Sequence, residues 1–140
     1  MSKMIFVNLP VRDLTRSREF FGKLGFTFNE QFSDDNAASL VIDADNGIYA
    51  MLLTEPFFKT FTTKEVADAA TTAEVIVALG VESRQEVDDL ADKALAAGGK
   101  SSKDPMDEGF MYGRSFQDLD GHLWEVMWMD PAAVQDPAAS

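Results

Sequence analysis

The sequence contains no cysteine and a single histidine, His122. Without a thiol there is no disulfide framework, no thiolate zinc site and no cysteine nucleophile to consider. Basic residues are also scarce, because 12 Lys and Arg stand against 24 Asp and Glu, which leaves a formal net charge of −12. A chain this acidic repels polyanions, so we expect no nucleic-acid partner and no binding to anionic membrane surfaces.

Long apolar segments are absent as well. No stretch approaches the roughly 18 consecutive apolar residues of a membrane-spanning helix. The first residues, MSKMIFVNLPV, lack the basic start, apolar run and small-residue cleavage site of a signal peptide. We therefore expect a cytoplasmic protein. The 140 residues, 46% of them hydrophobic, suffice for a single domain over 1–140 with its own core.

The first half of the chain predicts a strand, a helix and three further strands. MIFVNLPV has the apolar character of a strand, and Pro10 marks its end or an edge position. Asp13 is a suitable N-cap for the helix that follows. FTFNEQF, AASLVID and IYAMLL predict three short strands, the last two joined by a hairpin at Asn46-Gly47. This βαβββ module covers about 3–55.

The second half repeats this order. EVIVALGV predicts a strand, and Ser83 with Glu86 three residues later forms a capping box that opens a helix. A weak strand is expected in KSSKDP, followed by the strands FMYGRSFQD and HLWEVMWMD, which meet at the hairpin signal Asp120-Gly121. The second module covers about 74–130, and a short Ala-rich tail covers 131–140.

The two halves align at a nearly constant spacing. Val11 and Val81 lie 70 residues apart, and Gly47 and Gly121 lie 74 apart. What repeats is the order of elements and their caps, so the pattern predicts a duplicated supersecondary unit.

A connecting loop of about 56–73 joins the two modules. Its phenylalanines, Phe57, Phe58 and Phe61, make it too apolar for a free linker. These rings can cover a cleft, fill a dimer interface or pack beneath the loop, and the sequence does not separate the three.

Two stretches resemble a known family. NLPVRDLTRSREFFGKLGF at 8–26 and FQDLDGHLWEVMW at 116–128 are similar to motifs of the glyoxalase, bleomycin-resistance and extradiol-dioxygenase superfamily, also called the vicinal oxygen chelate fold. In the second stretch Leu119 stands where the family usually has Pro. The resemblance implies an α+β fold in which two βαβββ modules form a curled mixed sheet around a cleft. It also implies a homodimer.

The family holds a divalent metal at four positions, one on the first and one on the last strand of each module. Carried over by motif spacing, these positions are Phe6, Leu52, Ile76 and Glu125. Only Glu125 can bind a metal, and catalytic sites usually need three protein ligands. We therefore expect no metal cofactor, with a weakly bound divalent ion as the alternative.

Other candidate ligand-binding residues lie beside these positions. Asn8 shares a strand face with Phe6 by the two-residue period. Tyr112 and Arg114 share one face of the penultimate strand, where Arg114 can bind a ligand carboxylate or pair with Glu125. His122 is expected to hydrogen-bond the hairpin rather than bind metal.

These observations favour a metal-free small-molecule-binding protein with an apolar cleft. One alternative is a metal-dependent lyase, isomerase or dioxygenase of the same superfamily. Another is a metal-free enzyme in which Glu125 acts as general base. The fold alone does not choose between them, because one fold hosts many chemistries.

Overall fold

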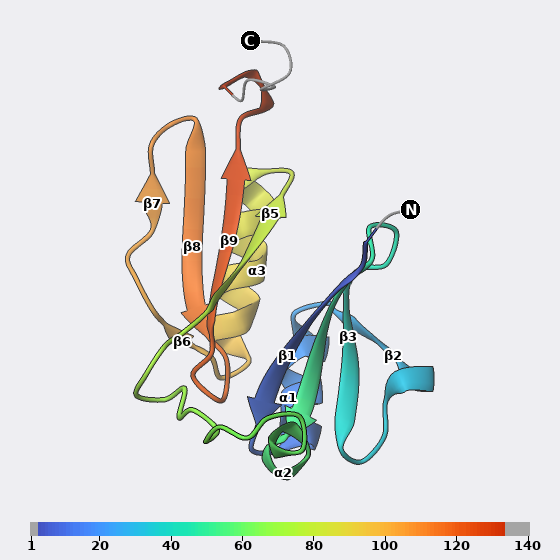
Figure 1. Ribbon diagram of the computed structural model, residues 1–140. Coiled ribbons are helices and arrows are strands. Elements are labelled where there is room, and N and C mark those ends of the chain that lie inside the picture. The colour runs from blue at the N-terminus through green and yellow to red at the C-terminus, as the bar shows by residue number, and fades with distance from the viewer. Residues whose placement is uncertain (1–2, 134–140) are drawn as a thin grey trace. The chain divides into compact units, whose positions relative to one another are not determined.

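The computed structural model describes residues 3–133, and the chain divides into two compact units between Thr72 and Ala73. Each unit has its own sheet with a helix against one face, as Figure 1 shows. Neither sheet closes on itself. The predicted α+β architecture of two βαβββ modules is confirmed.

The first module follows the predicted order of elements. They are β1 (Ile5–Val11), α1 (Leu14–Lys23), β2 (Thr27–Asn29), β3 (Ala37–Asp43) and β4 (Ile48–Thr54), with a short 3-10 turn at Glu30–Phe32. The sheet has the order β1-β4-β3-β2, with β1 parallel to β4. Pro10 therefore lies on an edge strand, where its missing N–H interrupts no ladder.

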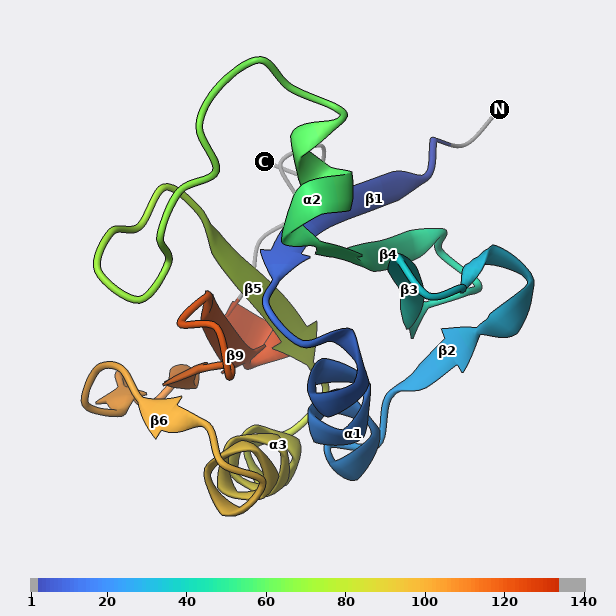
Figure 2. The ribbon, with the colours of Figure 1, turned by 90° about the horizontal axis from the view of Figure 1, so that it is seen from below.

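Local signals explain where α1 begins and what it buries. The Asp13 carboxylate caps the helix by accepting the Arg16 N–H at 3.1 Å. Phe20 and Phe21 then pack edge to face and are buried, together with Leu9 and Leu40 of the sheet. Burial of these large apolar side chains attaches the helix to one face of the sheet, an arrangement that Figure 2 shows from below.

The second module has one strand more than predicted. Its elements are β5 (Ile76–Val81), α3 (Arg84–Ala96), β6 (Lys100–Ser101), β7 (Met106–Asp107), β8 (Met111–Gln117) and β9 (Leu123–Met129). The sheet runs β5-β9-β8-β6, and β7 pairs separately with β8. The weak strand expected in KSSKDP is confirmed as β6. A two-residue strand such as β7 carries no alternation that a sequence pattern could reveal.

The connecting segment begins with a short helix rather than a loop. This helix, α2, spans Glu55–Lys59, with Pro56 in its first turn, where a missing N–H costs nothing. Phe57 and Phe61 pack edge to face at 5.1 Å between ring centroids, and Phe61 remains 69% exposed. A further 3-10 turn lies at Pro131–Ala133, and the predicted tail lies otherwise outside the described residues.

The last hairpin is organised by the buried carboxylate of Asp118. It accepts hydrogen bonds from the backbone N–H groups of Asp120 and His122 and from Trp124 Nε1, each at 3.0 Å. The Trp124 ring lies parallel to Phe116, with ring centroids 6.3 Å apart. Burial raises the pKa of the Asp118 carboxyl, against the lowering effect of His122 and these donors.

The backbone of His122 closes the same turn, because its carbonyl accepts the Asp118 N–H at 3.0 Å. The backbone N–H and carbonyl of His122 thus both take part in the hydrogen bonding of the hairpin, and the role of its side chain stays a prediction. The F-x-D-x-D-G motif is thus a structural device that fixes the start of β9. In residues 3–133, no helix is long and apolar enough to span a membrane.

Replacing Asp118 should destabilise the second module. Asp118→Ala removes the acceptor for three buried donors, so we expect a loss of about 2–4 kcal/mol in the free energy of unfolding. Urea denaturation would measure this loss. Asp45→Ala, in the exposed hairpin of the first module, is the matched control and should change stability by less than about 0.5 kcal/mol. Equal effects of the two substitutions would contradict the role of Asp118.

Candidate binding pocket

The two faces of the second sheet have different chemistry because side chains alternate along each strand. On β9, Trp124 and Val126 are fully buried, whereas Glu125 and Met127 are only partly buried. Glu125 and Met127 therefore lie on the face opposite to Trp124 and Val126.

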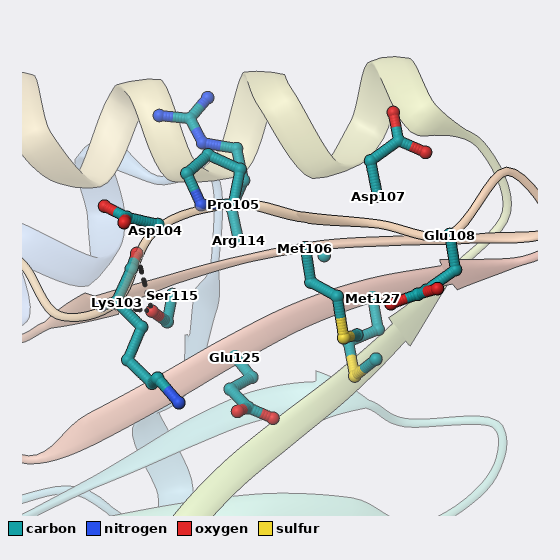
Figure 3. Close-up of a pocket in the computed structure, with 11 residues that line it drawn as sticks. Lys103, Asp104, Pro105, Met106, Asp107, Glu108, Arg114, Ser115, Glu125 and Met127 are labelled. Carbon is teal, nitrogen blue, oxygen red and sulfur yellow. Dashed lines mark hydrogen bonds between the residues drawn. The ribbon is translucent and has the colours of Figure 1, made fainter.

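A pocket of about 380 Å³ lies on the face that carries Glu125. Its floor comes from β8 and β9 and its wall from the segment that connects β6 to β8, as Figure 3 shows. The floor residues are Gly113, Ser115, Glu125 and Met127, and the wall residues are Lys103, Asp104, Pro105, Met106, Asp107 and Glu108. Arg114 completes the lining.

Strand pairing aligns the floor residues in rows. Ser115 lies opposite Glu125, while Gly113 lies between Met106 on one side and Met127 on the other. A Cβ at Gly113 would come within 3.2 Å of Met127 Cγ, so the glycine leaves room for this side chain to lie across it. Both methionines extend into the pocket in Figure 3, which gives the floor a flexible, polarisable surface.

The Glu125 carboxylate has no hydrogen bond and no ion pair within residues 3–133. Its opposite neighbours are Ala78 and Ser115, and the Ser115 hydroxyl already accepts the Lys103 backbone N–H at 2.9 Å. The nearest residues along β9 on the same face are Leu123 and Met127. A partly buried carboxylate among such neighbours keeps its hydrogen-bonding capacity for a bound molecule.

The pocket is more polar than the apolar cleft expected from the sequence. Within the described residues, the side chains of Lys103, Asp104, Glu108 and Glu125 form no ion pair. One ammonium group and three carboxylates leave these four side chains with a net charge of −2.

Tyr112 and Arg114 do not join Glu125, because alternation places them on the helix side of β8. The Tyr112 hydroxyl donates to Asp88 of α3 at 2.5 Å, and Arg114 pairs with Asp88 at 3.2 Å and Asp92 at 2.8 Å. The Tyr112 hydrogen bond is the main reason why the pKa of Asp88 is lowered. Figure 3 shows the Arg114 guanidinium turned toward the helix. The alternative in which Arg114 pairs with Glu125 is therefore wrong.

In the first module, Phe6 and Asn8 lie on the face of β1 opposite to the buried Leu9 and Val11. The Phe6 ring stacks on Tyr49 of β4 at 5.2 Å between centroids. Ile76 holds the corresponding place on β5, since it is 52% exposed and lies two residues from Ala78, the partner of Glu125.

The ligand position that the sequence places at Leu52, on the last strand of the first module, is wrong by one residue. Leu52 is fully buried and pairs with Leu9, so it lies on the helix side of β4. Asn8 pairs with Met51, just as Ala78 pairs with Glu125 in the second module. The counterpart of Glu125 is therefore Met51, because a shift of one residue along a strand moves a side chain to the other face.

Comparison with known proteins agrees with this architecture. A family model described as "Bleomycin resistance protein-like N-terminal" matches residues 3–42. A hypothetical protein from S. aureus is 30% identical, with a TM-score of 0.75 over 91% of this chain and 95% of its own. A glyoxalase/bleomycin resistance protein/dioxygenase family enzyme from Burkholderia phytofirmans has a TM-score of 0.71 at 18% identity, covering 89% of this chain and 96% of its own. The matched family model and the shared fold make this chain similar to proteins of the glyoxalase, bleomycin-resistance and dioxygenase superfamily.

A further solved structure shares this fold. It is the genomically encoded fosfomycin resistance protein FosX from Listeria monocytogenes, with a TM-score of 0.64 at 18% identity over 91% of this chain and 93% of its own. No curated protein matches the sequence.

The resemblance implies a divalent metal held by side chains on the first and last strand of each module, and the residues of this chain do not fit such an ion. At the corresponding places stand Phe6, Met51, Ile76 and Glu125, which offer one carboxylate. Within the part of the chain that the structure describes, no three His, Asp or Glu side chains converge on one point. A site with one protein carboxylate falls short of the three ligands usual for catalytic zinc and related metals.

Sequence reasoning identified Glu125 and Arg114 but none of the other residues that line the pocket. Two further pocket residues could have been predicted. Met127 follows Glu125 by two residues and therefore shares its strand face, and Ser115 pairs with Glu125 across the predicted hairpin at Asp120-Gly121. The wall carries no comparable signal, since all residues of 101–110 are exposed and only two of them belong to β7.

Proposed function

We propose that this chain is a cytoplasmic, metal-independent small-molecule-binding protein whose ligand occupies the pocket on the second sheet. The observation that carries the proposal is the Glu125 carboxylate, which lies partly buried in the pocket floor and has no partner among residues 3–133. Charged groups in such places are generally paired, because desolvation without a partner is costly. A ligand that pairs with Glu125 would recover this cost.

The charges of the pocket favour a ligand that carries an ammonium group. The unpaired side chains of the lining sum to −2, and the chain as a whole carries −12. An ammonium group can donate to Glu125, and its alkyl or aryl part can pack against Met106 and Met127. Anionic ligands would meet repulsion from the same carboxylates.

The unpartnered carboxylate also favours a second candidate, a metal-free enzyme. A carboxylate in a partly desolvated pocket can accept a proton from a bound substrate, which is the work of a general base. NMR spectra of a bound ligand over time separate the two candidates, because a binder leaves its ligand unchanged and an enzyme converts it.

Glu125→Gln should remove the preference for amines. In a thermal-shift screen of amines and their neutral isosteres, the wild-type protein should select the amines. The substitution should weaken amine binding roughly 10- to 100-fold, because a charge-assisted hydrogen bond is replaced by a neutral one. Glu74→Gln, at an exposed position outside the pocket, is the control. Equal binding of amines and isosteres, or no effect of Glu125→Gln, would contradict the assignment of the ligand class.

The purified protein should not retain a divalent metal. After dialysis, elemental analysis should find well under one zinc, nickel, iron or manganese per chain, since a single carboxylate holds a hydrated ion only weakly. Near-stoichiometric metal that Glu125→Ala releases would overturn metal independence and favour the metal-dependent lyase, isomerase or dioxygenase.

We also propose that the chain forms a homodimer, which the superfamily resemblance and the exposed Phe61 ring support. Sedimentation velocity should give about twice the 15.4 kDa mass of the chain. Phe61→Ser should weaken the dimer if the ring lies in the interface. A monomer that persists at high micromolar concentration would rule the dimer out.

A further inference from the structure

The wall of the pocket has little of its own to hold it in place. Every residue of 101–110 is exposed, so no buried apolar side chain anchors this segment. Besides the short ladders of β6 and β7, a few hydrogen bonds attach it to β8 and to the residues that follow β9. The Lys103 N–H donates to Ser115 Oγ at 2.9 Å and the Glu108 N–H to the Met111 carbonyl at 2.8 Å. At the ends of the segment, the Phe110 carbonyl accepts the Asp130 N–H at 2.7 Å and the Ser101 carbonyl accepts Gln117 Nε2 at 3.3 Å. Segments with so few buried contacts open at low free-energy cost.

Arg84, the first residue of α3, attaches the wall to this helix. Its two terminal nitrogens donate to the two carboxylate oxygens of Asp107 at 3.0 and 2.9 Å. One of them also donates to the Gly109 carbonyl at 2.8 Å. The guanidinium carbon lies 5.0 Å from the centre of the Tyr112 ring and 5.2 Å from that of Trp128.

This arrangement is more specific than an ordinary surface ion pair. The Arg84 and Asp107 side chains are 40% and 53% exposed, and exposed pairs usually contribute little. Here, however, the planar Arg84 guanidinium donates to both carboxylate oxygens of Asp107, and it packs on the rings of Tyr112 and Trp128, which fix its position. The Arg84 hydrogen bond is the main reason why the pKa of Asp107 falls to about 2.

Fixing Asp107 also fixes the residues on either side of it. Successive side chains of an extended segment point to opposite sides, so Asp107 turned toward the helix leaves Met106 and Glu108 turned toward the pocket. Figure 3 shows these three side chains in this alternation. We propose that Arg84 is the positioning residue of the pocket wall, which sets the orientation of Met106 and Glu108 without itself touching the ligand. Only the statement that this wall contacts a ligand rests on the proposed binding function.

The test compares amide exchange of the wall in the wild-type protein and in Arg84→Gln. The reporters are the N–H groups of Glu108 and Gly109, which donate to the Met111 carbonyl and to Asp107 Oδ1. Their exchange with solvent, measured by NMR, should rise roughly 5- to 20-fold in Arg84→Gln, while the amides of β9 keep their protection. Unchanged exchange of Glu108 and Gly109 would overturn the proposal.

Two further variants test whether the effect comes from the Arg84 hydrogen bonds themselves. One keeps the positive charge at this position, and the other removes a different contact between α3 and β8. Arg84→Lys keeps the charge but loses the fork, so the wall should loosen almost as much as in Arg84→Gln. Arg114→Gln is the matched control, since Arg114 also ties β8 to α3, through Asp88 and Asp92, without touching Asp107. Full rescue by lysine, or equal loosening in Arg114→Gln, would contradict a positioning role.

Asp107→Ala keeps the inference testable if Arg84 variants fold poorly, because it removes the same contact from the other side and should speed exchange of the Glu108 N–H. Where Arg84→Gln folds, the double variant should loosen the wall no more than either single variant, since both substitutions remove the same contact. In Arg84→Gln the pKa of Asp107 should also return from about 2 toward the ordinary 3.8. Because the folded-state pKa is the lower one, the pair stabilises the protein above pH 3.8, and this contribution is lost as the pH falls toward 2.

The outcomes for the wall and for ligand binding are independent. If the wall loosens in Arg84→Gln but no compound binds the wild-type protein, the positioning role stands and the proposed function fails. If amines bind through Glu125 but the wall is unaffected by Arg84→Gln, the binding function stands and the positioning role fails.

Discussion

The alternation of side chains along β8 and β9 determines where the charged side chains of these two strands can act. On β8 it directs Tyr112 and Arg114 to the helix side and Gly113 and Ser115 to the other. Glu125 on the neighbouring strand faces the second side, so the arginine nearest to it in the sheet cannot reach it. The sheet thus keeps two charged side chains apart: Arg114 pairs with Asp88 and Asp92 of α3, and Glu125 faces the pocket.

The pocket combines a fixed floor with a loosely attached wall. The floor belongs to the ladder between β8 and β9, and the buried Asp118 carboxylate holds the turn that joins these strands. The wall is exposed throughout 101–110 and takes its orientation from a few polar contacts. This division suits recognition, because a rigid carboxylate can define the ligand's position while methionine side chains adapt to its shape.

The sequence predicts those features whose causes lie within a few residues of one another. Asp13 and Ser83 cap helices through the N–H three residues later, and Gly47 and Gly121 adopt the positive φ of their turns. The register of β4 has no such local cause. IYAMLL is apolar on both faces, so its sequence does not reveal which residues face the helix. The ligand position of this strand was therefore assigned to Leu52 instead of Met51.

Contacts between residues far apart in the sequence were the second feature that the sequence did not predict. Arg114 meets carboxylates 22 and 26 residues earlier, and Arg84 meets a carboxylate 23 residues later. Periodicity places a residue on a face of a strand or helix, but it does not tell which helix covers that face or which loop crosses it. The family resemblance supplied the architecture without these contacts, because they depend on side chains that the motifs leave open.

The duplicated scaffold also explains how two similar modules present different open faces. Caps, hairpins and the buried residues on the helix side of each sheet specify the two modules. The first module therefore carries the stacked Phe6 and Tyr49 beside Met51, while the second carries Glu125 beside Met127. Strand pairing makes Met51 and Glu125 equivalent positions, yet one is a thioether and the other a carboxylate. The two modules share one topology although these residues differ, so the fold does not by itself determine the chemistry of its sites.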